Sequence, residues 1–151
     1  MKHNLIIIIG AIAALLFGAN AMAQGNHVTH CTGQNEVPPV ETQGQCQAIF
    51  KVRGDSLSYK LIVANVENVV AAHIHCAPEG TNGPVGVTLF GGSPVSVAGI
   101  LAQGPILAPN AGNACGWADV TDILAAIASG DTYVNVHTLA NLSGEVRGQI
   151  R

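Results

Sequence analysis

The stretch "QCQAIFKVRGDSLSYKLIVA", residues 45–64, decides the fold of this chain. Apolar residues occupy every second position on both sides of Gly54-Asp55, the pattern of two strands that each bury one face. A Gly-Asp pair between two such runs is typical of a tight hairpin turn. We therefore expect an antiparallel hairpin that buries Ala48, Phe50 and the residues that alternate with them.

Further short apolar runs, bounded by Gly, Pro, Asn or Asp, lie on both sides of this hairpin. They predict strands at residues 28–36, 69–75, 85–90, 95–101, 132–138 and 145–151, with a shorter run at 105–107. Residues 119–129 predict a helix, capped by Asp119 or Thr121 and stopped by Gly130. About eight short strands and one short helix indicate an all-β fold, an antiparallel β-sandwich of Greek-key type.

The first 23 residues have the pattern of a secretory signal peptide. A basic start is followed by the apolar run 5–17 and by Ala21-Met22-Ala23, a small-residue cleavage pattern. The run is too short for a membrane span, so we expect none once the signal is removed. Residues 24–151 then form a single domain, in the periplasm or secreted.

Charge excludes two classes of partner. The chain has six Lys or Arg and nine Asp or Glu, and Lys2 falls in the signal, so the exported part carries a formal charge of about −4. Its cations form no cluster that would follow phosphates or anionic lipid. We expect no nucleic-acid partner and no membrane-surface partner.

The four cysteines lie in the exported part, where disulfides form. They contain no C-x-x-C pair, which argues against a zinc knuckle. Three pairings are possible. We favour Cys31 with Cys46, which would join neighbouring strands, and Cys76 with Cys115, which would close a long loop.

Two strand segments carry histidines that can meet. Side chains alternate between the faces of a strand, so His73 and His75 in "AAHIHC" share a face, and His137 in "TYVNVHT" shares a face with Tyr133 and Asn135. If these strands adjoin, three imidazoles converge. Such a site suits copper or zinc. Because only neutral imidazoles bind a metal, its affinity should fall as the pH drops below the usual histidine pKa, near 6.5.

Other residues are weaker candidates for the site. Cys76 is a possible fourth ligand, but it follows His75 directly and points away from it, which favours the disulfide. His27 and His30 are candidates for an accessory metal site near the new N-terminus. Glu145 and Arg147 share a face of the last strand, where the simplest reading is a surface ion pair.

Three longer segments carry a family resemblance: "TGQNEVPPVETQGQCQAIFKV", "LSYKLIVANVENVVAAHIHCAPEGTNGPVGVTLF" and "DILAAIASGDTYVNVHTLANLSGEVRGQI". With A-H-I-H, G-P-V, Y-V-N-V-H-T and G-E-V-R-G-Q in order, they resemble the CHRD domain over residues 28–151. The resemblance implies a β-sandwich outside the cytoplasm, and its multidomain animal relatives imply extracellular binding. The cysteines depart from the family, because many members lack them.

The chain also has a more distant likeness to copper/zinc superoxide dismutase. By position, this likeness implies that His73, His75 and His137 are copper ligands, that Arg147 guides the anion, and that Cys76 is the disulfide cysteine of the loop. The histidine that bridges two metals and the zinc loop have no counterpart here. A zinc site is therefore not expected.

These observations lead to one main function and two alternatives. We expect an exported copper-binding protein for storage, tolerance or delivery of the metal, rather than an enzyme. The first alternative is a copper-only dismutase in which Arg147 attracts superoxide. The second is a metal-free extracellular binding or scaffold module whose histidines bond to neighbouring groups.

Overall fold

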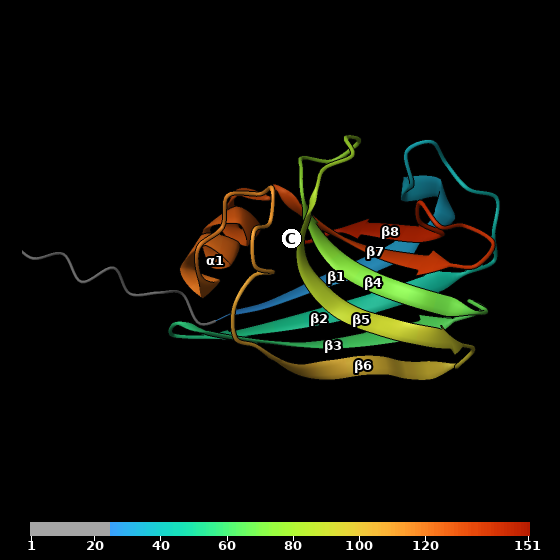
Figure 1. Cartoon of the computed structure of the whole chain (residues 1–151), viewed down its shortest axis with the longest axis horizontal. Coiled ribbons are helices and arrows are strands. Elements are labelled where there is room, and N and C mark those ends of the chain that lie inside the picture. Colours follow the sequence, from blue (N-terminus) through green and yellow to red (C-terminus); the bar gives the residue numbers. More distant parts are fainter. Residues whose placement is uncertain (1–24) are drawn as a thin grey trace, which may run out of the picture.

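The computed structural model describes residues 25–151, so the expected signal peptide at residues 1–23 lies outside the described residues. Eight strands, a 3-10 helix and an α-helix follow one another along this part (Figure 1). Their bounds are β1 Gly25–Thr32, η1 Gly33–Asn35, β2 Gln45–Arg53, β3 Ser56–Ala64, β4 Val69–Cys76, β5 Val85–Val95, β6 Gly99–Ile106, α1 Val120–Ser129, β7 Thr132–Thr138 and β8 Val146–Gln149.

The eight strands form one antiparallel sheet in the order β5-β4-β7-β8-β1-β2-β3-β6. The sheet curls so far that β5 lies close to β3 and β6 (Figure 1). The Tyr59 hydroxyl on β3 donates to the Leu89 carbonyl on β5 at 2.5 Å, which joins the edge strand β5 to the strand next to the opposite edge. The predicted antiparallel all-β fold with one short helix is confirmed, as a nearly closed, sandwich-like sheet.

The predicted hairpin is β2 and β3, paired from Gln45 with Ala64 to Arg53 with Ser56. Its turn contains Gly54 at a φ of 57°, where a side chain would be strained. The inward side chains of Phe50 and Leu61 have no exposed surface. Burial of such a side chain stabilises the fold by about 1.5–3 kcal/mol, so this alternation largely defines the core.

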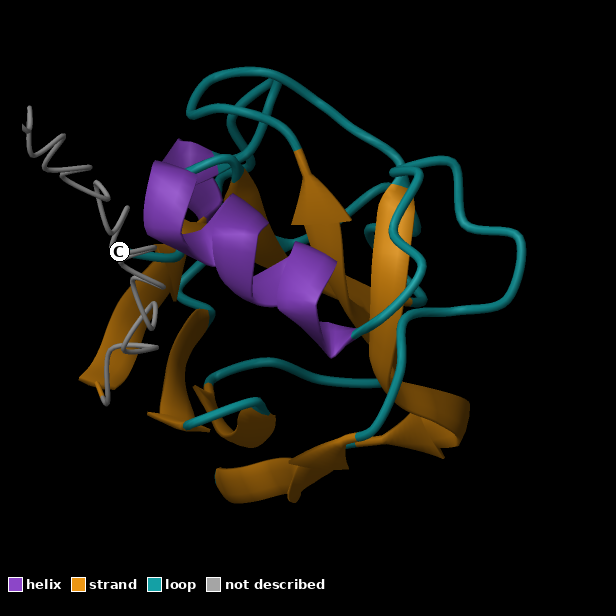
Figure 2. Ribbon diagram, turned by 90° about the vertical axis from the view of Figure 1, so that its left-hand side faces the viewer, coloured by secondary structure: helices purple, strands orange, loops and turns teal. Residues whose placement is uncertain are grey.

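Helix α1 lies across one end of the curled sheet (Figure 2). The Asp119 carboxylate accepts hydrogen bonds from the backbone N–H groups of Thr121 and Asp122 and so caps the helix. Gly130 ends it in the left-handed conformation. Its buried residues Ile123, Leu124 and Ile127 join the core. In the described part of the chain, no helix has the length and apolarity that crossing a membrane requires.

Both disulfides join segments that the fold brings together. Cys31 on β1 bonds Cys46 opposite it on β2, with the Cα atoms 4.6 Å apart. Cys76 at the end of β4 bonds Cys115 in the loop before α1, with a Cα separation of 5.8 Å. The two favoured pairings are confirmed.

The first strand is shorter than expected and ends at Thr32 rather than at residue 36. The chain turns there because the Gly33 carbonyl accepts hydrogen bonds from the N–H groups of both Glu36 and Val40. A Cβ on Gly33 would lie 2.1 Å from the Val40 carbonyl oxygen, so only glycine fits. The turn places Glu36 over the sheet instead of within it.

Candidate metal site

Strands β4, β7 and β8 have one apolar and one polar face. Ile74 and Val134 on β4 and β7 belong to the core. The opposite face carries polar rows across the three strands, because His73 pairs with Asn135 and His75 with Tyr133. Every residue of β7 is nevertheless buried, since loops also cover the polar face. The histidines therefore lie outside the hydrophobic core but beneath loops.

The structure brings His73, His75 and His137 together. One nitrogen of each ring lies within 4.8 Å of the corresponding nitrogens of the others, and no other such group of three His, Cys, Asp or Glu occurs in residues 25–151. His137 pairs with Ala71 in the ladder, so it is a diagonal neighbour of His73. Its Nε2 lies 3.0 Å from Nδ1 of His73. The predicted convergence is therefore present in the structure.

Backbone carbonyls set the tautomers of two of the rings. Nδ1 of His75 donates to the Gly83 carbonyl at 2.9 Å, and Nδ1 of His137 donates to the Leu142 carbonyl at 3.0 Å. A neutral imidazole carries one N–H, so Nε2 of each ring keeps its lone pair. His73 must then donate from Nδ1 to His137. To bind an ion with Nδ1, His73 would carry its proton on Nε2 instead.

The buried position keeps these imidazoles neutral. Desolvation, with smaller contributions from His137 and His75, lowers the pKa of His73 from 6.5 to about 4. Desolvation also lowers the pKa of His75 to about 4, against the opposing effect of the Gly83 hydrogen bond. The pKa of His137 is lowered for the same reason. We therefore expect the imidazoles to become protonated, and to stop binding a metal, at a pH below the 6.5 that the sequence suggested.

The donor atoms fit a metal ion. Two imidazole nitrogens at about 2.0–2.1 Å from an ion and 3.0 Å from each other, as in His73 and His137, subtend an angle of about 95°. The most distant pair of ring nitrogens, up to 4.8 Å apart, would have to approach by on the order of 1 Å for both to bind the same ion. Nε2 of His75 is buried and has no hydrogen-bond partner. Three imidazole nitrogens suit copper or zinc rather than calcium or magnesium.

Arg147 lies beside the site but is not free. It is 2% exposed, so the expected surface ion pair with Glu145 is wrong. Its guanidinium donates to Asn82 Oδ1 at 3.1 Å and to the carbonyls of Pro78 and Thr81 at 3.4 and 2.8 Å. Glu145 is also buried and instead accepts from Thr42, Thr138 and Asn141. Loops fold over both side chains, which a strand pattern does not reveal.

Tyr133 links Arg147 to the histidines. The Arg147 guanidinium carbon lies 3.5 Å from the centre of the Tyr133 ring. That ring stacks on His75, with centroids 4.7 Å apart and 8° between the planes. The sequence placed Tyr133 on the face of His137 but did not indicate this contact.

Glu36 is a buried carboxyl group that sequence reasoning missed. It is 6% exposed, and Oε1 accepts from Nδ2 of Asn135 at 2.5 Å. Burial raises its pKa from 4.5 to about 7, while the Arg147 charge and the Asn135 hydrogen bond oppose the rise. Its position follows from the turn at Gly33, and no local pattern in the sequence indicates it.

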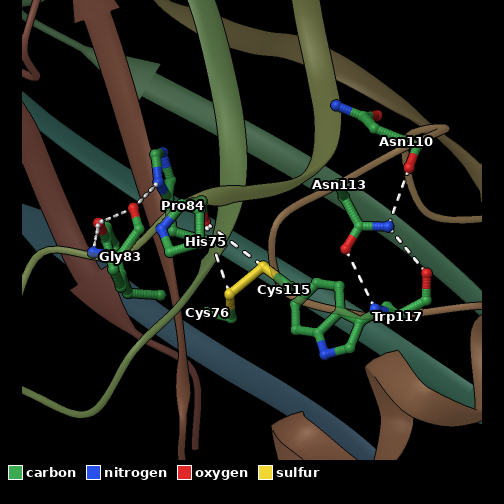
Figure 3. The surroundings of a disulfide bond; sticks show 9 residues. His75, Cys76, Gly83, Pro84, Asn110, Asn113, Cys115 and Trp117 are labelled. Atoms are coloured by element: carbon green, nitrogen blue, oxygen red, sulfur yellow. Dashed lines mark hydrogen bonds between the residues drawn. A yellow bond between two sulfur atoms is a disulfide. The ribbon is translucent and has the colours of Figure 1, made fainter.

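The other two candidate ligands lie apart from this group. His27 is partly buried on β1, whereas His30, an odd number of residues later, is exposed on the opposite face. The Nε2 atom of His30 lies 3.5 Å from Gln47 Nε2. The structure does not bring His27 and His30 together. Cys76 contributes to the disulfide rather than to the histidine group (Figure 3).

Comparison with known proteins identifies the family. The family model described as the CHRD domain matches residues 28–150. No curated protein and no solved structure matches the chain, so the likeness to superoxide dismutase is not confirmed. The family and the two disulfides are consistent with an extracellular protein. The expected resemblance is confirmed, and this chain belongs to the CHRD domain family.

Proposed function

We propose that this protein is exported and binds one copper ion through His73, His75 and His137, for storage, tolerance or delivery of the metal. The observation that carries the proposal is the buried Nε2 of His75, which has no partner and belongs to a ring of the three-histidine group. Buried polar atoms normally have hydrogen-bond partners. A ring fixed through Nδ1 with a bare Nε2 is the usual arrangement of a metal-bound histidine.

The choice of copper rests on the donor set. The group contains only imidazoles, and the four cysteines are paired in disulfides, so no thiolate competes. Imidazole sites bind several transition metals, and among the divalent ions of the first row Cu(II) binds most tightly. Three nitrogen donors without a carboxylate favour copper over magnesium, calcium or manganese.

The signal pattern and the disulfides support export. Residues 1–23 carry the basic start, the apolar run and the Ala21-Met22-Ala23 pattern of a signal peptide. Disulfides persist in oxidising compartments such as the periplasm and the extracellular space. The mass of the exported protein checks this part, with an N-terminus expected at Gln24.

A binding role is better supported than dismutation. A dismutase-like role requires Arg147 to attract an anion, but its guanidinium is buried and bonded to the loop above it. A metal-free module is supported by the hydrogen bond between His73 and His137. That reading leaves Nε2 of His75 unpartnered.

Copper titration of the mature protein tests the proposal. Cu(I) and Cu(II) are added in competition with chelators of known affinity, and zinc is titrated in parallel. We expect one copper ion per chain in the wild type, and loss of that binding in His73→Ala and His137→Ala. The matched control is His30→Ala, which removes an exposed imidazole outside the group and should bind copper like the wild type.

Two results would contradict the proposal. One is stoichiometric copper binding that survives both His73→Ala and His137→Ala. The other is tight binding that disappears in His30→Ala, which would place the ion near the N-terminus. Elemental analysis of the protein from its native compartment then identifies the metal that it carries.

A further inference from the structure

The side chain of Arg147 contacts two groups that in turn contact the ring of His75. Its guanidinium lies over Tyr133, which stacks on His75, and it also bonds residues of loop 77–84. That loop contains Gly83, whose carbonyl fixes Nδ1 of His75. Two separate routes therefore lead from one buried guanidinium to the same imidazole.

The first route passes through Tyr133. Strands β4 and β8 flank β7, so His75 and Arg147 approach the Tyr133 ring from neighbouring strands. A guanidinium is attracted to the face of an aromatic ring, more strongly when it is desolvated, and Arg147 is 2% exposed. The interplanar angle of 8° shows that the Tyr133 and His75 rings lie nearly parallel, so a ring fixed at Tyr133 restricts the tilt of His75.

The second route passes through loop 77–84. Arg147 donates to Pro78, Thr81 and Asn82, and Asn82 Nδ2 donates in turn to the Val37 carbonyl at 2.7 Å. The loop returns to β4 where the N–H of Cys76 donates to the Pro84 carbonyl at 3.1 Å. Figure 3 shows Gly83 and Pro84 beside His75 and the Cys76–Cys115 disulfide.

The Gly83 peptide is held at a defined place by this arrangement. Its N–H donates to the Tyr133 hydroxyl at 3.2 Å. A Cβ at this position would lie 2.0 Å from the Cys76 carbonyl oxygen. Only glycine therefore lets the loop backbone come this close to the end of β4. The Gly83 carbonyl is thereby aimed at Nδ1 of His75, which leaves Nε2 for an ion.

We infer that Arg147 is a positioning residue for His75: through Tyr133 and loop 77–84 it holds the ring in the tautomer and orientation of a metal ligand. The inference rests on the proposed metal site but does not depend on which metal fills it. It assigns Arg147 a role other than attraction of an anion. His137 provides an internal reference, because its Nδ1 is fixed by the Leu142 carbonyl and not by the loop that Arg147 holds.

The first test uses the metal-free protein, so it does not depend on copper binding. Long-range proton–nitrogen NMR spectra report which ring nitrogen of each histidine carries the proton. In the wild type we expect His75 to be protonated on Nδ1. In Arg147→Met we expect a mixture of His75 tautomers with His137 unchanged, and in Arg147→Lys a partial return towards the wild type.

The second test compares copper affinity with stability. Loss of groups that orient a ligand typically lowers metal affinity about 10–100-fold, and we expect this for Arg147→Met. The matched control is Val63→Ala, a core change in β3 that destabilises the fold without touching the site. It should lower the unfolding temperature and leave the copper affinity unchanged.

The outcomes separate this inference from the proposed function. A wild-type protein that binds no copper contradicts the proposed function, while a changed His75 tautomer in Arg147→Met still supports the inference. An unchanged His75 tautomer in a folded Arg147→Met overturns it. If that variant does not fold, Asn82→Ala removes one hydrogen-bond partner of the Arg147 guanidinium, and an unchanged His75 tautomer in Asn82→Ala overturns the inference instead.

Discussion

Replacement of Glu36 by Gln is expected to stabilise the protein at neutral and alkaline pH, but not in acid. Glu36 is 6% exposed, and burial raises its pKa from 4.5 to about 7. Above pH 7 the folded protein holds a buried carboxylate, which the unfolded chain solvates better. A glutamine is neutral at every pH and can still accept the hydrogen bond from Nδ2 of Asn135.

The magnitude follows from the linkage between pKa and folding. A folded-state pKa above the unfolded value means that the native state binds the Glu36 proton more tightly. The stability that this proton contributes is fully present below pH 4.5 and is lost as the pH rises through about 7. The rise of the Glu36 pKa from 4.5 to about 7 corresponds to about 3 kcal/mol at about 1.36 kcal/mol per pKa unit. Since solvent screens part of the charge, we expect about 2 kcal/mol.

Urea denaturation of both proteins at pH 4.5 and pH 8 measures this effect. The histidines titrate in both proteins, so their contribution cancels in the difference between the two free energies of unfolding. Glu67→Gln, which changes an exposed glutamate, serves as the control and should leave stability nearly unchanged at both pH values. The reasoning is refuted if Glu36→Gln changes stability equally at pH 4.5 and pH 8, or destabilises the protein at pH 8.

Two further predictions concern the candidate site. Metal loading should persist to about pH 5 and fall towards pH 4, because only neutral imidazoles bind and the pKa values of His73 and His75 are lowered to about 4; a midpoint near pH 6.5 in a chelator-competition series would contradict this. Gly83→Ala should lower stability by about 1–3 kcal/mol and weaken metal binding, because its Cβ meets the Cys76 carbonyl. Gly91→Ala, whose Cβ would make only an ordinary van der Waals contact with Thr88 Cγ2 at 3.8 Å, is the control in thermal unfolding, and equal effects would refute the prediction.

The sequence predicted the three histidines because a strand imposes a fixed period. Alternation places His73 and His75 on one face wherever the strand lies in the sheet. Their meeting with His137 required β4 and β7 to be neighbours, which local patterns do not determine, and the structure supplies this pairing. The hairpin and the helix were predictable for a similar reason, since their turn and cap residues act within a few positions.

The surroundings of the histidines could not be predicted in this way. The carbonyls of Gly83 and Leu142 come from loops whose paths depend on contacts with distant residues. Arg147 and Glu145 appear in the sequence as a surface ion pair on the last strand. Both are buried because loops, among them those that carry Thr42 and Thr81, cover the polar face of the sheet. A periodic pattern describes a strand's two faces but not what covers them.

The metal-free alternative can be weighed from the hydrogen bonds alone. In a purely structural histidine network each buried nitrogen would be bonded, and His73 and His137 meet this condition through each other and through Leu142. His75 does not, because its Nε2 is buried and unpartnered. Such an atom costs about 1–3 kcal/mol, which an apolar replacement of the ring would avoid. A structural role therefore accounts for the bonds of His73 and His137, and the proposed ion would supply the missing partner of Nε2 of His75.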